Sequence, residues 1–306
     1  MTTKTIRLLL PLLLVLGSAG AAPMGRLHSL LLDAAVAADA VVVAVGERGL
    51  IVRSEDSGRT WTRQESPTST TLTAVAFAAD GLRGWAVGHD ALVLATTDAG
   101  RTWRQAYQGP NLEESFLDLA VVAPGQIIVI GAYGQYLESR DDGQSWQPGT
   151  AAEDDSHLNR LTIGPSGTLY IAGERGTLLR SVDLGRTWLN IASPYDGSFF
   201  GVLPLSDTEL LAHGLRGRIY RSEDNGDTWE QVPHHKPALL ATACRLSTGE
   251  IVLAGQSRAF LVSRDGGHTF TAWPLPNTHA VAHLLIAPDG RLLAFGEEGV
   301  TPLPQP

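Results

Sequence analysis

The chain of 306 residues is 43% hydrophobic and 18% charged, and its formal net charge is -9 at pH 7. This acidic balance, without a basic run after residue 21, argues against nucleic acid as a partner, because that binding depends on neutralising phosphates. The single cysteine, Cys244, excludes an intrachain disulfide framework. The 33 glycines do not suit a helical bundle.

The first 21 residues have the order of a secretory signal peptide. Lys4 and Arg7 precede an apolar run at residues 8–16, and small residues follow at 18–21. The run is shorter than the roughly 20 residues that span a bilayer. We therefore expect cleavage after Ala21, no stable membrane insertion, and a periplasmic or secreted product in which residues 22–306 form one domain. Retention of the segment as a signal anchor is the alternative.

An octapeptide motif recurs with a period of about 42 residues. It reads Ser/Thr-x-Asp-x-Gly-x-Ser/Thr-Trp, and its sixth copy ends in Phe. A fixed period of this length is typical of repeat architectures, in which each unit adds a layer of core. The copies occupy residues 54–61, 96–103, 139–146, 181–188, 222–229 and 263–270.

A second signature, a glycine that ends an apolar strand and opens a short turn, precedes each motif. In the second repeat the strand signals lie at 73–78, 85–88, 92–97 and 102–105, which indicates a four-stranded meander. The sequence therefore predicts an all-β fold, a seven-bladed β-propeller of four-stranded antiparallel blades. The glycine signature occurs seven times, at Gly46, Gly88, Gly131, Gly173, Gly214, Gly255 and Gly296.

The last repeat ends before its octapeptide motif. Residues 279–287, 291–296 and 300–303 provide three strands at most. We expect the mature amino terminus, around residues 23–28, to supply the fourth strand and so close the ring.

The octapeptide resembles the Asp-box, or BNR repeat, of sialidases and several unrelated propellers. Its aspartate can accept backbone N–H groups in a tight turn, its glycine permits a positive φ, and its tryptophan can pack between blades. Six catalytic or calcium-binding aspartates are the alternative, but one active site does not need six copies around a ring. We expect no metal and no cofactor, and structural roles for Asp56, Asp98, Asp141, Asp183, Asp224, Asp265, Trp61, Trp103, Trp146, Trp188 and Trp229.

The turns between the second and third strands should open on the face that carries the blade-to-blade connections, opposite the Asp-box hairpins. We name this face the rim; loops on a rigid scaffold are where binding usually occurs. Phe199 and Phe200 can alternatively begin an inner strand, and we expect His234 and His235 to be solvated loop residues rather than metal ligands. We predict partner-binding roles on the rim for Arg48, His89, Tyr133, Arg175, Arg216, His157, Tyr195, Phe199 and Phe200.

Nearly the whole mature chain resembles the photosystem II stability and assembly factor family and its bacterial relatives outside photosynthesis. The resemblance rests on Gly-x-x-Gly-x-Ile/Leu-x-x-Ser/Thr-x-Asp-x-Gly-x-Thr-Trp at 46–61 and 173–188, and on Gly-Trp-Ala-Val-Gly at 84–88. It implies a non-catalytic accessory factor that binds a membrane-associated protein client, with a transporter as one candidate. It also implies that Arg48, Arg175 and Arg216 take part in binding. We also expect a monomer.

A sialidase-like glycoside hydrolase is the alternative function. Such enzymes use an arginine triad and a tyrosine nucleophile polarised by a glutamate. Arg48, Arg175, Arg216, Tyr133 and Glu174 supply those residue types. However, the Arg-Ile-Pro segment of sialidases is absent, the arginines recur in phase with the repeat, and sialidases have six blades. The sequence leaves open whether a small ligand or sugar binds in the central funnel.

Overall fold

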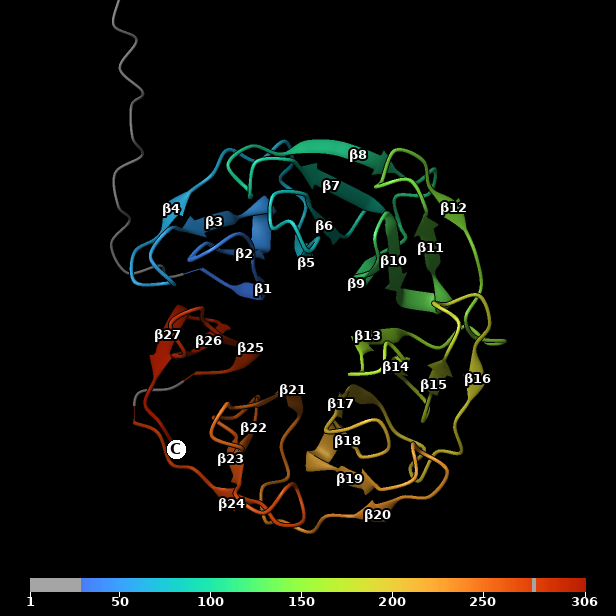
Figure 1. Ribbon diagram of the computed structural model, residues 1–306, viewed down its shortest axis with the longest axis vertical. Helices are drawn as coiled ribbons and strands as arrows, with labels where there is room; N and C mark the ends of the chain where they lie inside the picture. Colours follow the sequence, from blue (N-terminus) through green and yellow to red (C-terminus); the bar gives the residue numbers. More distant parts are fainter. Residues whose placement is uncertain (1–28, 277–278) are drawn as a thin grey trace, which may run out of the picture.

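The computed structural model describes residues 29–276 and 279–306, which form seven antiparallel β-sheets arranged in a ring (Figure 1). Each sheet is one blade, and its strands run in chain order from the axis of the ring to the periphery. Six blades have four strands, and within the described residues the seventh has three. The predicted seven-bladed all-β propeller is confirmed. The expected signal peptide and the fourth strand expected from residues 23–28 lie outside the described residues.

The innermost strands surround the axis, and the second strands lie behind them. The innermost strands are β1 (Leu31–Val36), β5 (Leu72–Phe77), β9 (Phe116–Ala123), β13 (Leu158–Ile163), β17 (Phe199–Pro204), β21 (Leu240–Arg245) and β25 (Val281–Ile286). The second strands are β2 (Val42–Gly46), β6 (Gly84–Gly88), β10 (Gln126–Gly131), β14 (Leu169–Gly173), β18 (Leu210–Gly214), β22 (Ile251–Gly255) and β26 (Leu292–Gly296). The second strands are almost entirely buried, because neighbouring blades cover both of their faces.

The third and fourth strands complete each blade toward the periphery. The third strands are β3 (Ile51–Ser54), β7 (Leu92–Thr96), β11 (Tyr136–Ser139), β15 (Leu178–Ser181), β19 (Ile219–Ser222), β23 (Phe260–Ser263) and β27 (Gly299–Leu303). The fourth strands are β4 (Thr62–Arg63), β8 (Arg104–Gln108), β12 (Gln147–Pro148), β16 (Leu189–Asn190), β20 (Glu230–Gln231) and β24 (Thr271–Ala272). Three short 3-10 turns, η1 (Glu47–Gly49), η2 (Ala132–Gly134) and η3 (Leu215–Gly217), join second and third strands.

The core consists of apolar clusters, each of which lies between two neighbouring blades. The cluster that joins the first and last blades contains Trp61, Leu293 and Phe295. The rings of Trp61 and Phe295 meet edge to face with centroids 6.0 Å apart. Apolar contact therefore closes the ring between residues more than 200 positions apart in the sequence.

The octapeptide hairpins repeat one set of hydrogen bonds. In the fourth copy, the Thr187 amide donates to Asp183 Oδ1 at 2.9 Å and its hydroxyl donates to Oδ2 at 2.6 Å. The Ser181 hydroxyl donates to Asp183 Oδ1 at 2.8 Å and accepts from the Gly185 amide. These bonds, led by the one from the Thr187 hydroxyl, lower the pKa of Asp183 to about 2. The aspartate oxygens are thus occupied in holding the turn.

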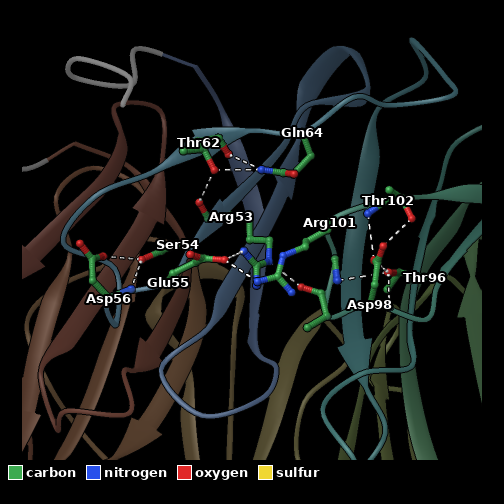
Figure 2. Close-up of polar contacts among 12 residues, drawn as sticks. Arg53, Ser54, Glu55, Asp56, Thr62, Gln64, Thr96, Asp98, Arg101 and Thr102 are labelled. Carbon is green, nitrogen blue, oxygen red and sulfur yellow. Dashed lines mark hydrogen bonds and ion pairs between the residues drawn. The ribbon is translucent and has the colours of Figure 1, made fainter. Parts of the chain in front are cut away.

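Neighbouring hairpins are also tied to one another. Figure 2 shows the first two copies, in which the Glu55 carboxylate lies between two arginines. Glu55 Oε1 is 2.5 Å from Arg53 Nη1 and 2.8 Å from Arg101 Nη2. The buried Arg53 also donates from Nε to the Ala99 carbonyl at 2.8 Å. One blade is thereby joined to the next on the hairpin face.

The hairpins and the rim turns lie at opposite ends of the strands. The hairpins bond to the turns between first and second strands, as from the Ser57 amide to the Ala40 carbonyl at 2.8 Å. The rim turns bond instead to the blade-to-blade connections, as from the Gly176 amide to the Gly197 carbonyl at 2.9 Å. The two predicted faces are therefore distinct, and the hairpin face is engaged in fixing the scaffold.

Candidate protein-binding rim and central channel

The rim turns present their central side chains outward. Arg48, Tyr133, Arg175 and Arg216 each have a left-handed backbone, with φ between 51° and 56°. This conformation is unusual for residues other than glycine and is held by the surrounding turn. All four side chains are exposed, and Tyr133 reaches 66% exposure. The rigid blades thus hold three arginines and one tyrosine in the solvent at one end of the propeller.

The rim over the third and fourth blades is a mixed-charge patch. The rings of Tyr133 and His157 meet edge to face with centroids 4.7 Å apart, and His157 Nδ1 is 3.6 Å from Glu174. Arg175 Nη2 is 3.0 Å from Asp155 Oδ1. The structure therefore brings Tyr133 and His157 together, and the charge of Arg175 is balanced by a neighbouring acid.

The aromatic residues that follow the fourth blade do not all reach the rim surface. The prediction of Phe199 as a rim contact is wrong, because its side chain is fully buried at the start of β17 and packs against Tyr220. Tyr195 is half-buried and stacks on Tyr220, with Arg218 5.6 Å above its ring. Phe200 is half-buried and lines the central channel. The segment acts mainly as packing beneath the rim.

Two histidines of the rim loops, His89 and His234, have defined partners. His89 is exposed, and its Nδ1 lies 2.9 Å from the Ser115 hydroxyl of the next blade. His234 is half-buried, and its Nε2 bonds to the Gly217 carbonyl while its Nδ1 accepts from the Lys236 amide at 3.1 Å. The expectation of a solvated loop residue is therefore wrong for His234, because its ring fastens the connection to the turn. His235 is exposed.

Sequence reasoning missed a charged cluster in the central channel. Arg160, on β13, reaches across to Asp33 on β1 at 3.3 Å, to Asp118 on β9 at 3.5 Å and to His283 on β25 at 3.0 Å. His283 Nδ1 is also 3.0 Å from Asp33. One guanidinium thus links four blades across the ring. These residues share one place in the repeat, the third residue of the innermost strand.

A β-bulge at the start of each innermost strand explains how these side chains reach the channel. The pairing with the second strand shifts between the first and third residues of the innermost strand in every blade. A bulge re-aims the residue that it displaces. The carboxylates also cap the next blade, because the Val75 amide donates to Asp33 and the Leu161 amide donates to Asp118. The sequence signal for this cluster was a charged or titratable third residue in four of the innermost strands, β1, β9, β13 and β25.

The two carboxylates of the cluster titrate differently. Burial raises the pKa of Asp118 to about 6, although the Arg160 charge opposes this shift. Burial acts in the same direction on Asp33, but His283 and Arg160 together outweigh it and lower its pKa to about 2. Nearby, burial lowers the pKa of His213 to about 4, so the ring is neutral at pH 7 and Nδ1 donates to the Leu240 carbonyl. Asp33 therefore carries the permanent negative charge beside Arg160.

The cluster divides the channel into two cavities, and Arg160 contributes to both. The cavity on the rim side has a volume of about 440 Å³ and is lined mainly by apolar residues, including Phe200. The cavity on the hairpin side has a volume of about 360 Å³ and includes His213 and His283. No group of three His, Cys, Asp or Glu side chains that could hold a metal occurs in the described part of the chain.

Within the described residues, no contact joins the residue types expected of a sialidase site. Arg48, Arg175 and Arg216 lie on the turns of three different blades. Within the described residues no carboxylate is shared among them, and Arg175 alone has an ion-pair partner. Tyr133 contacts His157 rather than Glu174.

Among residues 29–276 and 279–306 there is no helix with the length and apolar character needed to cross a membrane.

Comparison with family models matches residues 25–112 and 108–252 to the family described as "Photosynthesis system II assembly factor YCF48". A solved structure described as "YCF48 bound to D1 peptide" is 22% identical, with a TM-score of 0.75 over 92% of this chain and 94% of that chain. "YCF48 from Cyanidioschyzon merolae" is 17% identical, with a TM-score of 0.74 over 91% and 95% of the two chains. "Streptogramin B lyase structure" is 15% identical, with a TM-score of 0.75 over 90% and 94%. These likenesses show the fold alone. Comparison with curated proteins gives no match.

Proposed function

We propose that this chain, which belongs to the photosystem II assembly factor YCF48 family, is a non-catalytic propeller whose rim binds a protein client. The family model matches more than half of the chain. A structural neighbour was solved with a bound peptide, which supports a polypeptide as the partner. The client that we propose is a subunit of a membrane or envelope complex outside photosynthesis, with a transporter among the candidates.

One observation carries this proposal: the two faces of the ring use their polar side chains differently. On the hairpin face the repeated aspartates are occupied by hydrogen bonds within each turn. On the rim the central turn residue changes from Arg48 to His89 and Tyr133 across the first three blades, and all three are exposed on a rigid support. Varied side chains on a fixed scaffold are typical of a binding surface.

We further propose that residues 1–21 direct export and that the mature protein is a soluble periplasmic or secreted monomer. The order of basic, apolar and small residues at the amino terminus supports export. We assign the protein no cofactor and no nucleic-acid partner, in keeping with its acidic composition. We propose no sialidase-like activity, because within the described residues no contact joins Arg48, Arg175 and Arg216, and Arg175 is paired with Asp155.

Client capture from detergent-solubilised membranes of the source organism tests the proposal. The rim variant carries Arg48→Glu, Arg175→Glu and Arg216→Glu. Its matched control carries three charge reversals at exposed arginines in or beside the octapeptide hairpins, Arg104, Arg186 and Arg264.

We expect the wild type and the hairpin-face control to enrich the same membrane protein, and the rim variant to lose it at an unchanged thermal midpoint. Equal capture by the rim variant would contradict the assignment of the rim. Turnover of a fluorogenic sialoside or of aryl glycosides by the wild type would contradict the non-catalytic role.

A further inference from the structure

The rim of the fifth blade contains a basic cavity, which we name the blade-5 pocket. It has a volume of about 530 Å³ and lies between the turn η3, the outer strand β20 and the connection at residues 232–237. No acidic side chain lines it among the residues that the structure describes. Its polar lining consists of Arg216, Arg218, Gln231, His234, His235 and Lys236.

The cations of this pocket are not neutralised by the protein itself. Elsewhere on the rim, Arg175 is 3.0 Å from Asp155. Within residues 29–276 and 279–306, in contrast, Arg216, Arg218 and Lys236 form no ion pair. Three cations without counter-charges around one cavity in an acidic protein create a local attraction for anions.

Comparison of equivalent turns shows how the sequence creates this charge. The turns of the first and fourth blades read Glu-Arg-Gly at 47–49 and 174–176, and an apolar or hydroxyl residue follows. The fifth blade has Leu215 in place of the glutamate and Arg218 in the position after the glycine. The turn thus loses one acid and gains one base relative to its counterparts, while the backbone conformation at the central arginine is retained.

The pocket is held in shape by contacts that leave its cations free. His234 bonds to the Gly217 carbonyl and accepts from the Lys236 amide, which fastens the connection against the turn. The Arg218 guanidinium lies 5.6 Å from the centre of the Tyr195 ring, a cation–π contact that orients the side chain. The Arg218 guanidinium and the backbone of the connection are therefore arranged before any ligand arrives, which reduces the entropy that binding must cost.

We propose that the blade-5 pocket binds carboxylate groups of the client polypeptide, a proposal that rests on the rim-binding function above. Arginine presents a planar fork of donors that matches a carboxylate, and Lys236 adds a second point of attachment. The volume is in the range of pockets that enclose small ligands or a few side chains. A membrane surface or a nucleic acid would require an extended basic face, whereas the chain has a net charge of -9.

A labelled acidic peptide provides the test. The probe is a fluorescein-labelled (Glu-Gly)3 peptide with an amidated carboxyl end, and the matched probe is (Gln-Gly)3. Fluorescence anisotropy compares the wild type with Arg218→Gln/Lys236→Gln and with Arg104→Gln/Arg186→Gln, a control at two exposed arginines in or beside the octapeptide hairpins. We expect saturable binding of the acidic probe, at least a tenfold loss in the double variant, and a change below twofold in the control.

The lysine content of the chain gives an independent readout. The sequence has only two lysines, Lys4 and Lys236. A carbodiimide joins a carboxylate directly to a primary amine in contact with it, so the acidic probe should be cross-linked to Lys236 of the wild type. This measurement keeps the test decisive even where the double variant is less stable.

Several results would overturn the proposal: no saturable binding, equal binding of the neutral probe, an equal loss in Arg104→Gln/Arg186→Gln, or no probe cross-linked to Lys236. Co-sedimentation with phosphatidylglycerol vesicles that depends on Arg218 and Lys236, without peptide binding, would assign the pocket to lipid instead. Client capture that survives Arg218→Gln/Lys236→Gln but is lost in the rim variant would overturn the pocket and leave the proposed function standing.

Discussion

Replacement of Arg160 by methionine removes the cation that, among the described residues, contacts both channel carboxylates. Asp33 and Asp118 are almost fully buried, with side chains 5% and 4% exposed. Removing one partner of a buried ion pair typically costs about 3–5 kcal/mol, because the remaining charge has lost its compensation. The Arg160 side chain is itself 30% exposed to the channel, where water can partly replace it. We therefore expect a loss at the lower end of that range, about 3 kcal/mol.

Thermal unfolding followed by circular dichroism measures this loss. For a chain of this size about 1 kcal/mol corresponds to roughly 2 °C, so the midpoint at pH 7 should fall by about 6 °C. Arg175→Met is the matched control, since it breaks an exposed ion pair with Asp155 and should cost about 0–1 kcal/mol.

The pH dependence of the Arg160→Met deficit provides a second check. Without the arginine, the pKa of Asp118 rises further above its unfolded value. A group whose pKa is raised by folding destabilises the native state above that pKa, and the penalty is relieved as the pH falls. The deficit should therefore shrink between pH 7 and pH 5. A midpoint within 1 °C of the wild type at pH 7, or a deficit that grows on acidification, would refute the role of the cluster.

Two further predictions concern the hairpins and the rim turns. The pKa of Asp183 is about 2 in the folded state and ordinarily 3.8, so the stability that its charged form contributes should be present above pH 4 and lost between pH 4 and pH 2. Asp183→Asn should therefore lower the thermal midpoint at pH 7 and weaken the fall in stability between pH 4 and pH 2. Gly217→Ala should lower the free energy of unfolding in urea titrations more than Gly249→Ala does. Both glycines have a positive φ, which an alanine adopts only with strain. The new Cβ at position 217 would also lie 2.3 Å from the Lys236 carbonyl oxygen, whereas no atom lies within 4 Å of the new Cβ at position 249. Equal losses for the two glycine variants would show that backbone strain alone decides.

The blade count was predictable because its signals are local. Each Gly46-type turn and each Asp56-type hairpin specifies its own conformation through bonds within about eight residues, and repetition makes the pattern unmistakable. The last blade was predictable as three strands for the same reason. The sequence predicted the burial of Phe199 only as an alternative, because an aromatic residue at the start of a strand can point into the core or toward the solvent.

The channel cluster could not be predicted from local pattern. Arg160 and Asp33 are 127 residues apart, and only the closing of the ring brings them together. The blade-5 pocket was predictable only in part. Arg216 was predicted from its turn, whereas Arg218 and Lys236 lie beside it because the connection folds back over that turn. Sequence reasoning thus finds the elements and their faces, whereas sites made by several blades require the assembled structure.

Hydrogen–deuterium exchange of the protein with and without its captured client tests the central claim most directly. If the rim binds the client, the amides of the rim turns at 47–50, 132–135, 174–177 and 215–218 should gain protection, and those of the octapeptide hairpins at 54–61, 139–146 and 222–229 should not change. Protection confined to the hairpins, with unchanged exchange in the rim turns, would contradict the assignment of the binding face.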